Sequence, residues 1–253
     1  MPSDSRSQDR GAQPPQAAAS GNFPRAVLFD LDGTLLDSAP DLLAAANALL
    51  AERGRDALTL EQLRPVVSKG SRAMLGVAFP ELPPAERDAL IPDFLRRYET
   101  RIGRYSQLFD GIAALLQRLE DAGCVWGIVT NKPEYLARLI LPQLGWERRC
   151  AVLIGGDTLA ERKPHPLPLQ VAAQRIDVPP AQVAYVGDDE RDILAARAAG
   201  MASVAVLWGY RLDGEDPLAW RADALVAAPA DLLDARAWPG APQLPDLPDF
   251  PIA

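Results

Sequence analysis

The chain has 253 residues, a length that suits one large α/β domain or one domain that carries an insertion. Its hydrophobic content is 48% and its charged content is 24%, the ordinary balance of a globular protein. The net charge of −8 argues against binding to the phosphate backbone of a nucleic acid. No apolar run approaches the roughly 18 residues that a membrane span needs.

The two ends of the chain differ in composition from the part between them. Residues 1–22 are polar and lack the apolar segment of a secretory signal, so we expect a disordered leader on a cytoplasmic protein. Residues 237–253 are rich in proline, which excludes a helix interior and predicts an extended or free tail. Cys124 and Cys150 have no metal-type spacing, which favours two reduced thiols.

Short apolar runs rich in Val and Ile alternate with helical segments between these ends. Such runs are typical of strands that are buried on both faces of a parallel sheet. The expected strands lie at 25–30, 124–130, 151–156, 183–188 and 202–207. The expected helices lie at 111–122, 133–144, 167–175 and 192–199. Strand–helix alternation predicts right-handed βαβ units and therefore a doubly wound α/β fold.

One interval breaks this alternation, because no convincing strand occurs between the first strand and residue 124. The interval holds segments with helical periodicity and helix-type caps, such as Thr59 followed by Gln62. We therefore expect residues 38–104 to form a small helical cap domain that is inserted into the sheet domain. The catalytic core would then consist of residues 23–37 and 105–236.

Polar residues follow the expected strands. The first strand ends in Asp30, the second in Thr130 and Asn131, and the fourth in Asp188, with Asp192 one helical turn further on. Lys163 follows the third strand. Ligands of open α/β sheets bind beyond the carboxyl ends of the strands, where the strand order reverses. If the first strand is central, these residues converge in one crevice.

The acids Asp30, Asp32 and Asp188 would repel one another there, and Mg²⁺ removes that problem because it binds carboxylates while keeping water and phosphate as its other ligands. Thr130, the backbone near Asn131 and Lys163 supply donors for the oxygens of a phosphoryl group. The sequence therefore predicts a site that handles phosphate with Mg²⁺.

The acids of the segment "FDLDGT" can divide the chemistry. Asp30 can attack phosphorus and form an aspartyl phosphate. Asp32 can protonate the leaving oxygen and then activate the water that hydrolyses the intermediate.

These motifs, "DLDGT" at 30–34, "TN" at 130–131, "KP" at 163–164 and "GDDERD" at 187–192, resemble the four motifs of the haloacid-dehalogenase-like hydrolases. The resemblance covers residues 24–236. It implies that Asp30 is nucleophile and metal ligand, and that Asp32 is acid/base with its backbone carbonyl on the metal. It also implies phosphate binding by Thr130 and Lys163, a metal ligand at Asp188, and a supporting role for Asp192 through water or by orienting Lys163.

Within that superfamily the sequence is similar to the phosphoglycolate phosphatase group. Segments such as "SKGSRAML", "WGIVTNKP" and "AVLWGY" resemble its branch that acts on N-acetylmuramic acid 6-phosphate. The resemblance implies a small carboxylated phosphate ester as substrate. A sugar phosphomutase and a catalytically silent regulator remain alternatives, and the oligomeric state is left open.

Several further residues have two interpretations. Lys69 and Arg72 are either cap residues that read the substrate or ordinary solvated charges. Asp189 and Glu190 suit a helix N-terminus better than a ligand site. His165 is interpreted as a loop residue, and Trp126 and Trp208 as core or wall residues.

Overall fold

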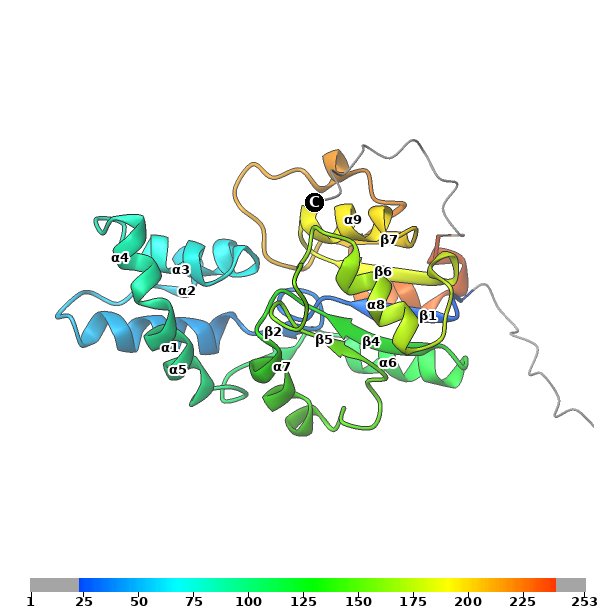
Figure 1. The fold of residues 1–253 in the computed structure, drawn as a ribbon, viewed down its shortest axis with the longest axis horizontal. Helices are drawn as coiled ribbons and strands as arrows, with labels where there is room; N and C mark the ends of the chain where they lie inside the picture. The colour runs from blue at the N-terminus through cyan, green and yellow to red at the C-terminus, as the bar shows by residue number, and fades with distance from the viewer. Residues whose placement is uncertain (1–22, 240–253) are drawn as a thin grey trace, which may run out of the picture.

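The computed structural model describes residues 23–239, and its centre is a parallel sheet of six strands (Figure 1). β1 (Ala26–Phe29) lies between β4 (Val125–Val129) and β6 (Val183–Gly187) and pairs with both in parallel. The outer strands are β5 (Leu153–Ile154) beside β4, and β7 (Ala202–Val206) and β8 (Ala224–Val226) beyond β6. The predicted doubly wound α/β fold is confirmed, with the first strand at its centre. The short strand β8 was not predicted.

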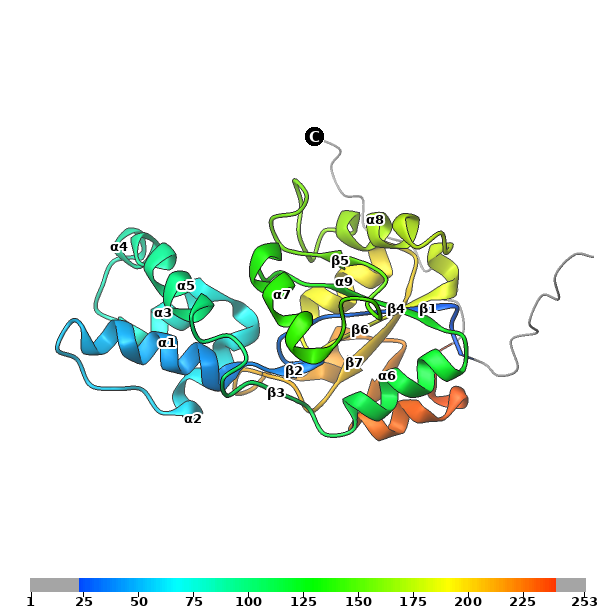
Figure 2. The ribbon, with the colours of Figure 1, turned by 90° about the horizontal axis from the view of Figure 1, so that it is seen from below.

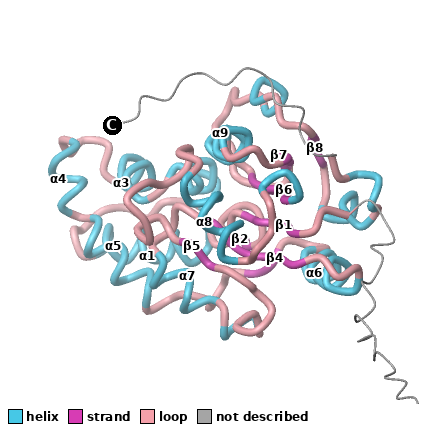
Figure 3. Tube along the Cα trace, turned by 45° about the vertical axis from the view of Figure 1, so that its right-hand side comes forward, coloured by secondary structure: helices cyan, strands magenta, loops and turns pink. Residues whose placement is uncertain are grey.

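The alternation of side chains along β1 explains why both faces of the sheet are covered by helices. Val27 and Phe29 pack in one cluster with residues of α6 (Ile112–Asp121). Ala26 and Leu28 point to the other face and pack with residues of α8 (Leu167–Arg175). Figures 2 and 3 show the strands between these helix layers. A strand with two apolar faces is therefore buried completely.

The remaining helices of the sheet domain differ slightly from their predicted bounds. α7 (Glu134–Ile140) is followed by a short 3₁₀ turn at Pro142–Leu144, because a proline cannot continue the hydrogen bonds of an α-helix. α9 (Glu190–Ala198) starts before residue 192, because Asp189 is its N-cap and the Asp192 side chain accepts the N–H of Asp189 in return. The assignment of Asp189 to a helix N-terminus is thus confirmed.

The interval between β1 and β4 folds into a group of helices to one side of the sheet (left in Figure 1). These helices are α1 (Ala39–Ala51), α2 (Leu60–Leu63), α3 (Ser71–Ala78), α4 (Pro84–Ala89) and α5 (Ile91–Glu99), with a 3₁₀ helix at Arg64–Lys69. The capping box of Thr59 and Gln62 is present at the start of α2. The role of this group as a cap stays a prediction.

Two short segments join the helical group to the sheet domain. β2 (Leu36–Asp37) leads into α1, β3 (Gln107–Leu108) leads back, and the two pair antiparallel. Asp41, at the start of α1, is fully buried. Its carboxylate accepts three backbone N–H groups from residues 103–106 and the hydroxyl of Ser106. This one side chain therefore ties the return segment to the outgoing helix.

The folded part of the chain extends further toward the C-terminus than the predicted boundary at residue 236. Trp238 is only 5% exposed, and its indole N–H donates to the carbonyl of Leu232 at 3.0 Å. The rest of the predicted tail and the predicted leader at 1–22 lie outside the described residues. Across residues 23–239, no helix combines the length and the apolar character that crossing a membrane requires.

We expect Asp41→Ala to lower the free energy of unfolding by about 2–4 kcal/mol, because it leaves buried N–H groups without an acceptor. Chemical denaturation followed by circular dichroism measures this change. The control is Asp56→Ala, at an exposed position, which should stay within about 0.5 kcal/mol of the wild type. A loss as small as that of the control would show that Asp41 does not hold the two segments together.

Candidate active site

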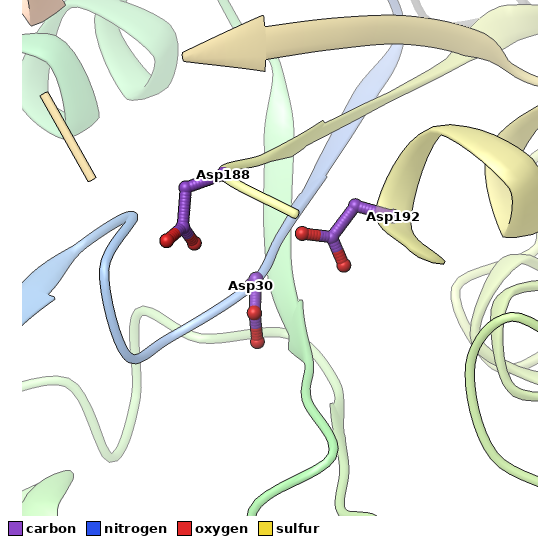
Figure 4. Close-up of side chains that lie close together, drawn as sticks. All are labelled: Asp30, Asp188 and Asp192. Carbon is purple, nitrogen blue, oxygen red and sulfur yellow. The ribbon is translucent and has the colours of Figure 1, made fainter. Parts of the chain in front are cut away.

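Three carboxylates, two from the ends of neighbouring strands and one from the start of a helix, converge at the carboxyl end of the sheet (Figure 4). Asp30 directly follows β1, Asp188 directly follows β6, and Asp192 lies in the first turn of α9. Each offers an oxygen that lies within 4.8 Å of the others, and all three residues are buried. Because β1 and β6 are adjacent and parallel, their ends bring together acids that are far apart in the sequence.

Hydrogen bonds hold Asp188 from three directions. The hydroxyl of Thr34 donates to its Oδ1 at 2.9 Å. The backbone N–H of Tyr210 and the hydroxyl of Ser68 donate to its Oδ2 at 2.9 and 2.7 Å. Ser68 belongs to the helical group, so Asp188 is also a point where that group touches the sheet domain.

The backbone approaches the Asp188 side chain closely at two glycines, Gly33 and Gly209. A Cβ atom at Gly33 would collide with the Asp188 carboxylate, and one at Gly209 would collide with the Asp188 side chain. Gly33 also has a φ of +88°, a backbone conformation that favours glycine. The backbone therefore fits tightly around this carboxylate.

Burial and mutual repulsion make the acid cluster costly without a cation. Burial, and next the charges of Asp30 and Asp192, raise the pKa of Asp188 well above its usual range. Burial also raises the pKa of Asp192 to about 6, against the opposing effect of the Lys163 ammonium. A divalent cation among these oxygens would offset the repulsion, so the donor set fits a hard metal ion.

Lys163 supplies positive charge inside the cluster. Its ammonium lies 2.7 Å from Asp192 and 3.1 Å from Asp30, and it donates to the hydroxyl of Tyr185 at 2.7 Å. Burial lowers the pKa of Lys163, but the charges of Asp192 and Asp30 outweigh that effect, and the net pKa is raised. Lys163 therefore stays charged beside Asp30.

Thr130 and Asn131 follow β4, the neighbour of β1. Thr130 is buried, and its hydroxyl accepts the backbone N–H of Lys132 at 3.3 Å. The side-chain amide of Asn131 donates to the carbonyl of Lys163 at 2.9 Å, while its Oδ1 is buried without a hydrogen bond among the described residues. Asn131 thus joins the loop after β4 to the loop that carries Lys163.

The side chain of Asp32 does not join the acid cluster. Both of its oxygens lie 3.0 Å from the ammonium of Lys132, which also donates to the hydroxyl of Tyr98 at 2.8 Å. Tyr98 lies on α5, so the Asp32 carboxylate faces the helical group. Lys132 was missed as a candidate residue.

A signal for Lys132 is present in the composition. Only three of the chain's 26 basic residues are lysines, and they stand at positions 69, 132 and 163. All three lie at this site, paired with acids. Because lysine is so rare in this chain, its three positions could have been considered together as candidate site residues.

The 3₁₀ helix Arg64–Lys69, which ends at Gly70, brings Lys69 to the sheet domain. The ammonium of Lys69 donates to Asp189 at 2.8 Å and to Glu215 at 2.6 Å, and Arg191 donates to the carbonyl of Ser68. Arg72 is different, because its side chain is 71% exposed and pairs with Asp88 within the helical group. A direct role for either residue toward a substrate stays a prediction.

A cavity of about 360 Å³ separates the helical group from the carboxyl end of the sheet. Its polar lining includes Asp30, Asp32, Thr130 and Lys132. Its apolar lining comes largely from the helical group, namely Leu42, Val67, Met74, Ile91 and Leu95. A ligand there would meet charge from the sheet domain, and both apolar surface and the charged residues Lys69 and Arg72 from the helical group.

The remaining candidates have structural contacts. The Nδ1 of His165 accepts the backbone N–H of Leu167 at 3.2 Å, as expected of a loop residue. Trp126 is buried and packs edge-on against the ring of Trp146. The indole N–H of Trp208 donates to the carbonyl of Thr34 at 3.0 Å. Trp208 therefore lies beside the residue whose hydroxyl donates to Asp188.

The fold and this site agree with a comparison against protein families. A family model described as haloacid dehalogenase-like hydrolase matches residues 27–206. The chain belongs to the haloacid dehalogenase-like hydrolases.

Individual relatives narrow the class of reaction. A phosphoglycolate phosphatase from Xanthomonas campestris pv. campestris (strain 8004) is 73% identical over 217 residues, which make up 86% of this chain and 98% of that protein. An N-acetylmuramic acid 6-phosphate phosphatase from Pseudomonas putida is 46% identical, covering 82% of this chain and 94% of that protein. The crystal structure of a predicted phosphoglycolate phosphatase from Haemophilus somnus 129PT superposes with a TM-score of 0.75 at 28% identity, covering 85% and 98% of the two chains. The chain is thus an enzyme of the phosphoric monoester hydrolase class.

Proposed function

We propose that the chain is a Mg²⁺-dependent phosphatase in which Asp30 attacks the phosphorus of a small carboxylated ester and is transiently phosphorylated. The geometry of Asp30 carries this proposal. The backbone N–H of Leu31 and the ammonium of Lys163 meet its Oδ1 at 2.8 and 3.1 Å. Within residues 23–239 no hydrogen bond engages Oδ2, so that oxygen keeps its lone pairs for attack on phosphorus.

Groups around Asp30 are suited to hold the phosphoryl group. Lys163 lies 3.1 Å from Asp30, so its charge can neutralise an oxygen of a phosphate bound beside that carboxylate. Thr130 and Asn131 follow the adjacent strand β4, where the Thr130 hydroxyl and the backbone N–H of Asn131 can donate to the remaining oxygens.

Asp32 is suited to proton transfer at the leaving group. Its carboxylate lies beside Lys132 and Tyr98 and thus faces the helical group, on the side where the rest of an ester would extend into the cavity. We assign it protonation of the leaving oxygen and then removal of a proton from the water that hydrolyses the aspartyl phosphate.

Asp30, Asp188 and the backbone carbonyl of Asp32 are the groups that would hold Mg²⁺. The hydroxyl of Ser68 lies 2.7 Å from the Oδ2 of Asp188 and 3.5 Å from the carbonyl oxygen of Asp32, so these two oxygens face a common point. Carboxylate and carbonyl oxygens are the donors that Mg²⁺ prefers. When bound, the ion would neutralise charge on the carboxylates and on the phosphoryl oxygens.

Asp192 lies in the same acid cluster, yet its own contacts favour a different role. Its Oδ1 is 2.7 Å from the Lys163 ammonium, and its Oδ2 accepts the backbone N–H of Asp189 at 3.0 Å. Because Asp192 is the acid that lies nearest to the Lys163 ammonium, at 2.7 Å against 3.1 Å for Asp30, we assign Asp192 to orienting Lys163, not to binding the ion directly.

The cavity favours an ester larger than 2-phosphoglycolate. Its volume of about 360 Å³ and its apolar lining would leave a two-carbon acid in contact with little of the wall. N-acetylmuramic acid 6-phosphate offers a sugar ring, two methyl groups and a carboxylate to the same surface. We therefore rank it above 2-phosphoglycolate, a choice that the name of the Pseudomonas putida relative also supports.

A panel of phosphate esters tests this choice. It contains N-acetylmuramic acid 6-phosphate, 2-phosphoglycolate and simple hexose phosphates, compared by kcat/KM with Mg²⁺ present. The highest kcat/KM is expected for the muramic acid ester. A preference for hexose phosphates, which lack a carboxylate, would overturn the proposal of a carboxylated substrate.

Substitution of the two motif acids should separate the two chemical steps. Asp30→Asn is expected to abolish the phosphoenzyme, because it removes the nucleophile. Asp32→Asn should let the phosphoenzyme form slowly and then accumulate, because the water is no longer activated. Rapid quench with labelled substrate measures both. Near-normal turnover by Asp30→Asn would mean that the nucleophile lies elsewhere.

The packing of Gly33 against Asp188 offers a test of the metal site. We expect Gly33→Ala to weaken Mg²⁺ binding by at least about 10-fold, because the added methyl group displaces the Asp188 carboxylate. Isothermal titration calorimetry with MgCl₂ measures the affinity, and excess EDTA should abolish activity of the wild type. Gly54→Ala is a matched control, because Gly54 has a φ of +64° but open space around it. Unchanged Mg²⁺ affinity in Gly33→Ala would argue against Asp188 as a ligand.

Arg72 and Lys69 should respond differently to truncation. The exposed pair of Arg72 with Asp88 is weak, so the guanidinium is free to turn toward a substrate carboxylate in the cavity that it borders. Arg72→Ala should lower kcat/KM for the carboxylated substrate, by an amount that corresponds to a loss of roughly 1.5–3 kcal/mol of transition-state stabilisation. The kcat/KM for p-nitrophenyl phosphate should stay nearly unchanged. Lys69→Ala should affect both substrates alike, because its ammonium binds Asp189 and Glu215. Equal losses in Arg72→Ala would assign Arg72 to the fold instead.

A further inference from the structure

Lys132 links the sheet domain, the motif acid Asp32 and the helical group through one ammonium. Its side chain is only 4% exposed. The ammonium donates to Oδ1 and Oδ2 of Asp32, each at 3.0 Å, and to the hydroxyl of Tyr98 at 2.8 Å. An ammonium has three hydrogens, so these three acceptors satisfy it fully.

This saturation decides between two roles for Lys132. A lysine that binds the substrate carboxylate needs a free N–H directed into the cavity, and the acceptors of Asp32 and Tyr98 leave none. A lysine that holds a neighbouring acid in place has just such a set of contacts. The symmetric approach to both oxygens of Asp32 fixes the plane of that carboxylate.

Tyr98 makes the arrangement depend on the position of the helical group. It lies on α5, which packs against α1, and it is 1% exposed. Its ring also faces the ammonium, with 4.3 Å between Nζ and the ring centroid. When α5 lies against the sheet domain, as it does here, Tyr98 therefore holds Lys132 against Asp32.

We propose that Lys132 is a positioning residue that holds the carboxylate of Asp32 ready to accept a proton from water, and that Tyr98 makes this depend on closure of the helical group. The proposal rests on the proposed function. In the step concerned, the oxygen of water attacks the phosphorus of the aspartyl phosphate and the bond between phosphorus and the Asp30 oxygen breaks. The proton of that water passes to Asp32, and Lys132 keeps its own protons throughout.

The test uses Lys132→Met, which keeps the length of the side chain and removes the charge. In Lys132→Met, kcat/KM for p-nitrophenyl phosphate should change less than about 3-fold, because p-nitrophenolate leaves without a proton and formation of the phosphoenzyme from this substrate does not need Asp32. Hydrolysis does need it, so kcat should fall by roughly 10–100-fold and KM should fall with it. Intact-mass analysis of acid-quenched samples should show phosphoenzyme accumulating during turnover.

Two tyrosine variants test the dependence on the helical group. Tyr98→Phe keeps the ring and removes the acceptor, so kcat should fall by roughly 3–10-fold with some phosphoenzyme accumulating. Tyr105→Phe is the control, because Tyr105 is 61% exposed, and it should behave as the wild type. A Tyr98→Phe enzyme with wild-type kcat would overturn the role of closure.

Other outcomes would overturn the role of Lys132. A rise in KM for the carboxylated ester alone, without phosphoenzyme, would make Lys132 a substrate-binding residue. An equal loss of kcat/KM on all substrates with a lower melting temperature would make its role structural. Asp32→Asn serves as the reference: if it accumulates phosphoenzyme and Lys132→Met does not, this inference alone fails. If Asp32→Asn accumulates none, the proposed role of Asp32 fails first.

Discussion

Buried negative charge at the carboxyl ends of β1 and β6 is the constraint to which the rest of the site is fitted. The parallel pairing of these strands places Asp30 and Asp188 side by side, and α9 adds Asp192. Carboxylates this close raise one another's pKa values unless cations and N–H or O–H donors surround them. The structure supplies such donors from every element nearby, and the remaining repulsion is what a divalent cation would offset.

The three lysines of the chain pair with different acids of the site. Lys163 neutralises the pair of Asp30 and Asp192, Lys132 pairs with Asp32, and Lys69 pairs with Asp189. An ammonium suits these places because it is a compact charge with three donors that can point in different directions, whereas a guanidinium is a flat fork. A chain that uses arginine for most of its positive charge thus keeps lysine for the site.

The sequence was sufficient to predict the residues that follow the strands, and insufficient to predict contacts between the helical group and the sheet. Asp30, Thr130 and Asp188 follow apolar runs whose parallel pairing is predictable, so their convergence follows from the rule for open α/β sheets. Nothing in the local pattern shows that Lys69 reaches Asp189 or that Lys132 reaches Tyr98, because these contacts form only when the helical group lies against the sheet domain. The strand β8 was not predicted, because a strand of three residues is too short to show a recognisable hydrophobic pattern.

The sheet domain and the helical group also differ in what they would contribute to the reaction. The first would supply the reacting groups, and the second would supply most of the surface that selects the substrate. The groups that we propose for binding the phosphoryl group belong to the sheet domain and are tied to one another by buried contacts, such as that of Asn131 with the loop of Lys163. The surface that a leaving group would touch comes largely from the helical group, where Arg72 is exposed and weakly held. Buried contacts thus hold the residues of the sheet domain in place, whereas Arg72 on the facing helical group is exposed. Lys132 connects the two parts, because it follows β4 in the sheet domain and its third acceptor, Tyr98, lies on α5 of the helical group. In the proposed mechanism, a substrate that holds the helical group against the sheet domain would therefore also position Asp32, the proposed acid/base.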